Sequence, residues 1–379
     1  MPLKMPGRNE PCWCHSGLKY KKCHLNRVEQ PRGNPWEVVE INKKAFQKKS
    51  CFAEGGDFGA CEGKIINAHT VSRGPNLTKI ARNGQVIQYK GNVTVFEKTG
   101  GRLKPDLIGI GQASAFNGYC AKHDRELFSC IENEPFTGRV DQLLAVAFRT
   151  LSRELHGKDA SGNMRDMLRD SDKGRTFEEQ LAIQHWLKTM DVGIKASQRE
   201  LRATFSTLKQ ALAGKQPEVL RSLVLKCDAA LPFMAAGAWS AFTDLNGNDI
   251  QDGNSTEQLE QLFISTFAGD PTSYICVSWL DKPGAPGKII ADQLASIAPD
   301  RQVEVFLQFV VKHVENVFFN PDWFEALAPG QRKTLDRLAA SGLDSFGSVP
   351  QAALRADVTF GMPAVSRSTF VGCKSKLSG

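Results

Sequence analysis

The sequence predicts an α+β protein in which small cysteine-rich modules precede a mainly helical domain with a small antiparallel sheet. Three observations support this fold class. Clustered cysteines and polar, glycine-rich stretches occupy the first 130 residues, helical periodicity begins near Val140, and two alternating apolar runs lie between the helical blocks. Helices and strands are thus segregated along the chain, which is typical of α+β folds rather than of doubly wound α/β folds.

Length and composition limit the class of protein. The chain has 379 residues, of which 41% are hydrophobic, enough for one large domain or two to three smaller ones. It contains no apolar run of about 18 residues, and its start lacks the apolar block of a secretory signal. We therefore expect no membrane insertion and a cytoplasmic location. Ten cysteines are too few for a disulfide scaffold in a chain of this length and favour metal sites instead.

The net charge of +7 is concentrated at the amino terminus, where Lys and Arg outnumber Glu between Met1 and Lys49. Such an arm suits phosphate backbones or acidic protein surfaces, because counterion release favours binding in proportion to the charges neutralised. A merely solvated tail accounts for the charge alone equally well.

Residues 7–24 cannot fold by burying apolar surface, since they contain a single aliphatic side chain, Leu18. They do contain four metal-ligand side chains in the pattern C-x-C-x8-C-H, which can close a tetrahedron around Zn²⁺. Metal binding would then supply the missing folding free energy. The predicted ligands are Cys12, Cys14, Cys23 and His24.

This segment closely resembles the SEC-C motif, a small zinc module at the carboxyl end of the preprotein-translocating ATPase and in many otherwise unrelated bacterial proteins. The resemblance rests on "GRNEPC", the second cysteine, "SG" and "KYKKCH". Trp13 and His15 depart from it, where proline and glycine are usual, but neither removes a ligand. The resemblance implies a closed structural zinc site that binds protein partners or ribosomal surfaces and performs no chemistry.

A second set of ligands lies further along the chain. Cys51 and Cys61 flank a glycine-rich loop, and Cys120 and His123 have C-x-x-H spacing at an expected helix start, with a hairpin around Gly91 between the two pairs. The simplest interpretation is that these four residues bind a second tetrahedral zinc ion in a treble-clef arrangement. Because nine residues separate the first pair, the alternative is that the cysteines are simply buried and His123 caps a helix.

The order of residues around His69 resembles the ββα-metal zinc fold of HNH nucleases. It also resembles a group of bacterial proteins of unknown function, often associated with antiphage defence, that share an "AH" strand end, an "NG-x-V" turn and a "C-x-x-H-D-x-x-x-F" tail. The nuclease resemblance implies His69 as general base, with Asn83 and Asp124 near a catalytic Mg²⁺ or Mn²⁺. Ala68 stands where an acidic residue or histidine is usual, so a structural role of His69, as zinc ligand or hydrogen-bond partner, is the alternative.

From Pro135 the sequence changes character. Residues 140–158, 176–215 and 289–341 have apolar side chains at helical spacing, with Thr176 as an expected helix cap, whereas residues 235–252 and 261–280 alternate as strands do. Cys227 and Cys276 are expected to be small buried hydrophobes. The expected organisation is a SEC-C module (1–28), a basic linker (29–48), an HNH or treble-clef-like zinc module (49–134), a mainly helical α+β domain (135–340) and a flexible tail (341–379).

Three functions fit these features. The favoured one is a zinc-binding bacterial protein that recognises nucleic acid or a ribonucleoprotein surface, in the antiphage context that the second resemblance implies. The alternatives are a metal-dependent HNH-like nuclease and a protein adaptor that docks through the SEC-C module. The sequence gives no oligomeric state and leaves open whether the protein is an enzyme. The expected nucleic-acid contacts are Arg8, Lys19, Lys21, Lys22 and Arg73.

Overall fold

The computed structural model describes residues 5–90, 103–253, 255, 257–342, 354–355 and 357–372. The chain forms two compact units. Unit 1 comprises residues 1–48 and 155–199, and unit 2 comprises residues 49–154 and 200–379. Two of the limits fall inside the long helices α5 (Val140–Ser161) and α7 (Phe177–Ala213), so the units do not coincide with the five segments expected from the sequence.

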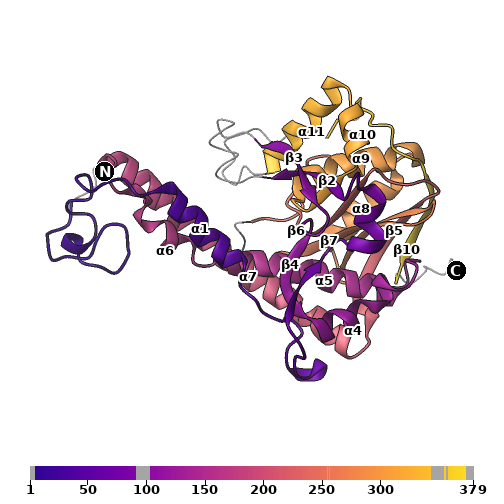
Figure 1. Ribbon diagram of the computed structural model, residues 1–379, viewed down its shortest axis with the longest axis horizontal. Coiled ribbons are helices and arrows are strands. Elements are labelled where there is room, and N and C mark those ends of the chain that lie inside the picture. The colour runs from indigo at the N-terminus through magenta and orange to yellow at the C-terminus, as the bar shows by residue number, and fades with distance from the viewer. Residues whose placement is uncertain are drawn as a thin grey trace. The chain divides into compact units, whose positions relative to one another are not determined.

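Unit 1 is helical apart from its first residues. Up to residue 34 the backbone makes mostly turns around a small core of Cys12, Cys14, Tyr20 and Cys23. α1 then lies beside α6 (Figure 1). The shorter elements are η1 (Tyr20–Lys22), α1 (Pro35–Phe46), α6 (Met164–Leu168) and η4 (Arg169–Asp172).

The start of α7 confirms the expected cap at Thr176. Its Oγ1 accepts a hydrogen bond from the backbone N–H of Glu179 at 3.3 Å, while the Glu179 carboxylate accepts from the Thr176 N–H at 2.8 Å. This reciprocal pair is a capping box, which satisfies two of the N–H groups that a helix start leaves without partners.

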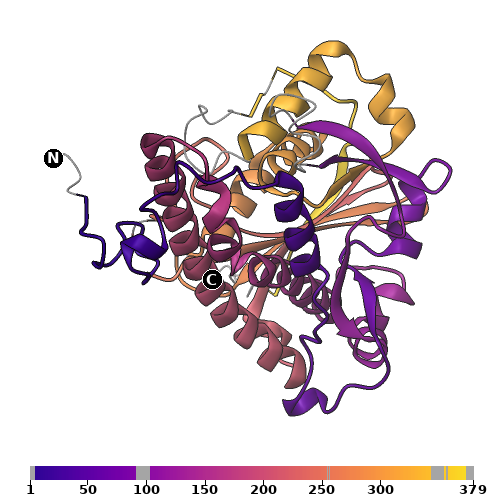
Figure 2. The same ribbon diagram turned by 60° about the vertical axis from the view of Figure 1, so that its left-hand side comes forward.

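Unit 2 is built on a large antiparallel sheet (Figure 2). Its eight strands have the order β10-β5-β8-β7-β6-β9-β2-β3. Strands β5, β7 and β8 are buried along nearly their whole length, because side chains on both faces of the sheet are covered. The strands are β2 (Gln85–Lys90), β3 (Lys104–Gly109), β5 (Leu220–Cys227), β6 (Phe233–Ser240), β7 (Gln261–Ala268), β8 (Ser273–Leu280), β9 (Val317–Phe319) and β10 (Val365–Val371).

Helices pack on this sheet and on one another. α8 contacts β5, β7 and β8, and α9 contacts α8, α11 and β10. Cys227 and Cys276 are fully buried, as expected of small hydrophobes. The helices are α8 (Pro286–Ser296), α9 (Pro299–His313), α10 (Pro321–Ala326) and α11 (Pro329–Gly342), with short turns at η2 (Gly56–Phe58), η3 (Arg73–Leu77), α2 (Thr78–Ile80) and η5 (Pro217–Val219).

A second, two-stranded sheet positions the cysteine-rich part of unit 2. β1 (Ile65–His69) pairs antiparallel with β4 (Ala115–Cys120), and α4 (Ala121–Glu132) follows β4 without a loop. The chain between β1 and β4 contributes β2 and β3 to the large sheet. These elements therefore form a ββα unit whose two strands are separated by an excursion into the main sheet.

The α+β class is confirmed, but the sheet is larger than expected. β5 lies directly after a long helical pattern, β9 has only three residues, and β10 contains four consecutive exposed polar residues, so none carries a strong strand signal. β10 lies within the expected tail at 341–379, where pairing with β5 corrects the expectation of a loose segment for residues 365–371. The expected turn near Gly91 lies outside the described residues, and β2 pairs with β3 instead.

Candidate metal centres and an adjacent pocket

The first cluster lies in unit 1, where the turns of residues 10–24 bring four ligand atoms together. Cys12, Cys14, Cys23 and His24 are all buried, and their ligand atoms lie within 4.8 Å of one another. The Nδ1 atom of His24 is 3.2 Å from Cys12 Sγ and 3.1 Å from Cys23 Sγ, and the Sγ atoms of Cys14 and Cys23 are 3.5 Å apart. A hydrogen bond from Cys23 lowers the pKa of Cys14 to about 3, so Cys14 favours the thiolate. The same bond raises the pKa of Cys23, and burial raises the pKa of Cys12.

The second cluster lies in unit 2 at the junction of β4 and α4. Cys120 is the N-cap of α4 and His123 lies in its first turn, so the strand-to-helix turn fixes both side chains. The His123 Nδ1 atom is 3.3 Å from Cys51 Sγ, 3.8 Å from Cys61 Sγ and 3.4 Å from Cys120 Sγ. All four ligand atoms again lie within 4.8 Å of one another.

Both clusters fit a tetrahedral zinc ion. With Zn–S near 2.3 Å and Zn–N near 2.0 Å, neighbouring ligand atoms of a tetrahedron are about 3.5 to 3.8 Å apart, close to the separations found in both clusters. Each histidine presents Nδ1 to the thiols, because its Nε2 atom bonds an acceptor: Asp172 Oδ2 at 2.8 Å for His24, and the Phe58 carbonyl at 3.0 Å for His123. This arrangement is common around zinc-binding histidines. Both four-residue sets could therefore hold zinc.

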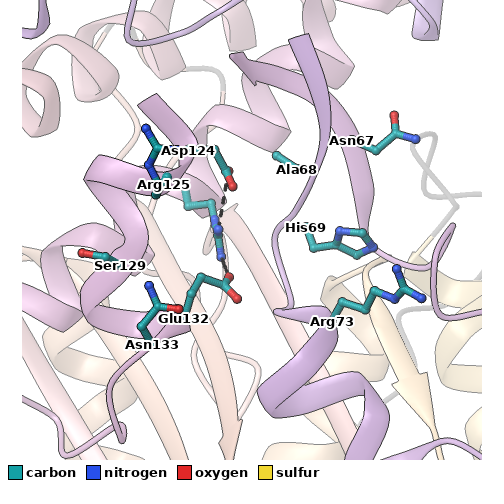
Figure 3. Close-up of a pocket in the computed structure, with 10 residues that line it drawn as sticks. Asn67, Ala68, His69, Arg73, Asp124, Arg125, Ser129, Glu132 and Asn133 are labelled. Atoms are coloured by element: carbon teal, nitrogen blue, oxygen red, sulfur yellow. Dashed lines mark hydrogen bonds and ion pairs between the residues drawn. The ribbon is translucent and has the colours of Figure 1, made fainter. Parts of the chain in front are cut away.

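A pocket of about 220 Å³ lies beside the second cluster (Figure 3). β1 contributes Asn67, Ala68 and His69 to it, α4 contributes one wall, and α5 contributes Arg149. Because β1 pairs with β4 and α4 follows β4 directly, the junction that carries Cys120 and His123 also places the β1 and α4 walls of the pocket next to each other. The remaining lining residues are Arg73, Asp124, Arg125, Ser129, Glu132 and Asn133.

His69 is half-buried at the end of β1, and its Nε2 atom is 3.1 Å from the carbonyl oxygen of Ile110. Because a carbonyl only accepts, Nε2 carries the proton and Nδ1 is left as a hydrogen-bond acceptor. Burial lowers the pKa of His69 below its ordinary value, with Arg149 and Arg73 acting in the same direction. This lower pKa favours the neutral imidazole, whose Nδ1 atom carries the lone pair that a proton acceptor needs.

The opposite wall carries a buried ion-pair group. Arg149 bonds the Glu132 carboxylate and lies 3.5 Å from Asp124 Oδ1, and Ser72 Oγ donates to Glu132 at 2.7 Å. Two further guanidinium groups, those of Arg73 and Arg125, belong to exposed residues at the pocket and form no hydrogen bond or ion pair with the described part of the chain. The pocket therefore combines two carboxylates that are paired with Arg149 and two exposed guanidinium groups that have no partner among the described residues.

The structure brings together only some of the residues expected at a catalytic site. His69, Arg73 and Asp124 line the pocket, whereas Asn83 lies in the tight turn before β2, at a φ of +52°, and is not among the lining residues. Arg125, Glu132 and Arg149 line it without having been expected. The spacing Asp124–Phe128–Glu132 along one helical stripe could have pointed to Glu132, but Arg149 comes from another helix and has no local signal.

The expected nucleic-acid contacts of the amino-terminal module are on the surface of unit 1. The four basic side chains expected to contact nucleic acid are exposed, as is His15 next to the ligand Cys14, whereas Arg27 is buried. His24, in contrast, lies on the buried side of the module, facing Asp172. The exposed basic residues are Arg8, Lys19, Lys21 and Lys22.

Comparison with known proteins identifies one part of the chain. Residues 8–26 match the family model described as SEC-C motif, which confirms the resemblance of this segment and is consistent with zinc at the first cluster. Within the described residues, no helix is both long and apolar enough to cross a membrane. No curated protein and no solved structure matches the chain.

Proposed function

We propose that the protein binds nucleic acid, alone or on a ribonucleoprotein surface, and that the pocket beside the second cluster holds a backbone phosphate. The observation that carries this proposal is the pair of exposed guanidinium groups of Arg73 and Arg125 at a pocket whose carboxylates are already paired with Arg149. Guanidinium groups bind phosphate bidentately. The paired carboxylates repel an incoming phosphate less than free ones would.

The SEC-C module supplies a second basic surface. Its side chains Lys19, Lys21 and Lys22 are exposed, while the side of the module that contains His24 is covered by the chain itself. Partner contacts of this module therefore use the lysine side. The antiphage context belongs to this proposal and is tested by phage plating on cells that express the protein or its pocket variant.

Binding is tested by fluorescence anisotropy with labelled single-stranded RNA, single-stranded DNA and duplex DNA between 50 and 200 mM salt, a range in which phosphate contacts are strongly screened. The variant R73A/R125A removes two phosphate contacts, so we expect weaker binding and a salt slope reduced by about 2. The control K288A/K333A removes two exposed charges from α8 and α11, away from the pocket. Equal losses in both variants would show that the pocket is not the binding site, and no binding at all would favour the protein adaptor.

A second candidate, phosphodiester cleavage with His69 as general base, is favoured by the free Nδ1 atom of a neutral His69 in the same pocket. Asp124 is the carboxylate that would bind Mg²⁺ or Mn²⁺, but Arg149 lies against it and bonds Glu132. A divalent ion must displace part of this group, which is why binding without cleavage is the first proposal.

Cleavage is tested with plasmid and RNA in the presence of Mg²⁺ or Mn²⁺, with H69A beside the wild type. Loss of cleavage in H69A, with unchanged nucleic-acid affinity, would establish the nuclease. The control H185A changes a histidine of α7 outside the pocket. A wild type that binds but cleaves neither substrate would exclude this candidate and leave recognition.

A further inference from the structure

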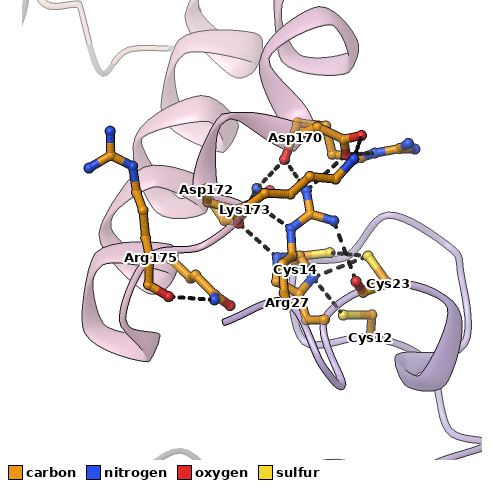
Figure 4. A network of polar contacts seen from close by, with 12 residues as sticks. Cys12, Cys14, Cys23, Arg27, Asp170, Asp172, Lys173 and Arg175 are labelled. Carbon is orange, nitrogen blue, oxygen red and sulfur yellow. Dashed lines mark hydrogen bonds and ion pairs between the residues drawn. The ribbon is translucent and has the colours of Figure 1, made fainter. Parts of the chain in front are cut away.

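A buried carboxylate far along the chain from the SEC-C motif completes the surroundings of the first cluster. Asp172 is the last residue of η4, lies 148 residues after His24 in the sequence, and is fully buried. Its Oδ2 atom accepts hydrogen bonds from His24 Nε2 and Gln184 Nε2, both at 2.8 Å, and its Oδ1 atom accepts from Arg27 Nε at 2.5 Å (Figure 4).

These bonds satisfy the carboxylate on both oxygens, which a buried charge requires. The Arg27 guanidinium is also buried and extends the network to the Arg169 carbonyl at 2.6 Å and to Asp170 Oδ1 at 2.8 Å. Asp170, in contrast, is half-exposed and does not touch His24. Of these two neighbouring carboxylates, only Asp172 contacts a predicted metal ligand.

Contacts outside the carboxylate join the same two segments of unit 1. The Gly174 N–H donates to the Arg27 carbonyl at 2.9 Å, Arg165 donates to the Cys14 carbonyl at 3.1 Å, and the rings of Trp13 and Phe177 meet edge to face at 5.7 Å. Gly174 has a φ of +66°, and a Cβ atom there would lie 2.6 Å from the Gln30 carbonyl. The approach of the two backbones therefore depends on glycine.

We infer that Asp172 is a positioning residue of the first metal centre, and that an ion bound there holds residues 164–184 against the SEC-C segment. By accepting the Nε2–H, Asp172 fixes the tautomer and the ring plane of His24, so that Nδ1 faces the three cysteines. The ion and the carboxylate then lie on opposite sides of one imidazole. The SEC-C segment of this chain is thus part of a larger folded unit rather than an independent docking plug.

The first test measures zinc affinity by competition with a chromophoric chelator at fixed pH for the wild type, D172N and D170N. Loss of an outer partner of a metal-binding histidine typically weakens metal affinity about 10- to 100-fold, so we expect this loss for D172N. D170N, which removes an ion-pair partner of the same Arg27 without touching His24, is expected to stay within about twofold of the wild type. Equal affinities of D172N and D170N would overturn the role of Asp172.

The second test needs no change at Asp172 and so remains decisive where D172N does not fold. Hydrogen exchange of residues 164–184 is compared between C12S, which removes a ligand of the first centre, and C61S, which removes one of the second. We expect faster exchange of this segment in C12S and unchanged exchange in C61S, because only the first centre contacts it through Asp172. Unchanged exchange in C12S would show that the ion does not hold the segment.

Discussion

Arg149 is the residue on which the charge balance of the pocket depends. Its side chain is only 2% exposed, lies over the Phe128 ring at 4.2 Å, and pairs with Glu132 and Asp124. Burial raises the pKa of Asp124 although Arg149 acts to lower it, so removing the guanidinium would leave this carboxylate without its compensating charge. A buried ion pair with one partner missing is far less stable than the intact pair.

We therefore expect R149M to lower the free energy of unfolding by about 3 to 5 kcal/mol, because Glu132 and Asp124 would lose their ion-pair partner and face an apolar side chain instead. The measurement is urea unfolding of the zinc-loaded protein followed by circular dichroism. The matched control is R153M, one turn further along α5, where the ion pair with Glu154 is partly exposed and a change of at most about 1 kcal/mol is expected. Equal losses in the two variants would contradict a buried, stability-determining role for Arg149.

At the scale of elements, α4 joins the metal centre to the pocket. Its N-cap and first turn carry Cys120 and His123, and its later turns carry Glu132 on the pocket wall. The ligands could be predicted from the sequence, because the cysteines are too few for a disulfide scaffold and the C-x-x-H spacing fits a helix start. Arg149 in the pocket and Asp172 at the first cluster could not be predicted, since both are ordinary charged residues whose burial arises from tertiary packing alone.

Strand β10 is an element of the fold that could not be predicted from the sequence either. Its residues alternate polar and apolar only weakly, but the segment before it is fixed by Glu304 of α9, whose carboxylate accepts the N–H groups of Phe360 at 2.7 Å and Met362 at 3.0 Å. Nothing in the sequence around Glu304 indicates that its carboxylate accepts hydrogen bonds from a segment more than 50 residues away. The position of the edge strand β10 thus depends on the Glu304 hydrogen bonds, which cannot be predicted from the spacing of apolar residues.

E304Q tests this contact. The amide keeps one acceptor and turns a donor toward the other N–H group, leaving a buried donor unsatisfied, so we expect the free energy of unfolding to fall by about 1 to 3 kcal/mol. Urea unfolding measures the change. The control E315Q alters an exposed glutamate just beyond the same helix and should change the stability by less than about 0.5 kcal/mol. An E304Q protein as stable as E315Q would show that the segment before β10 is held by other contacts.

At the scale of the whole molecule, each compact unit contains one Cys3His set among its described residues, and the two sets are arranged in the same way. In both, Nδ1 of the histidine faces three thiols while Nε2–H is held by an oxygen, a carboxylate in unit 1 and a backbone carbonyl in unit 2. The apolar core of unit 1 around the first set is limited to a few side chains, whereas unit 2 has an extensive core of its own. Loss of metal should therefore affect the folding of unit 1 more severely than that of unit 2.

The metal content of the variants tests this arrangement. Protein purified without chelators should contain two zinc ions per chain, C12S and C61S one each, and C12S/C61S none, because removing one thiolate from a four-ligand structural site weakens zinc binding strongly. Mass spectrometry of the metal gives the counts, and C227S, which alters a buried cysteine outside both sets, should keep two ions. Since cysteine must lose its proton to bind, both ions should be released as the pH falls. A wild type with a single ion that C61S still retains would refute the second centre, and the pocket that α4 lines would then need another explanation for its shape.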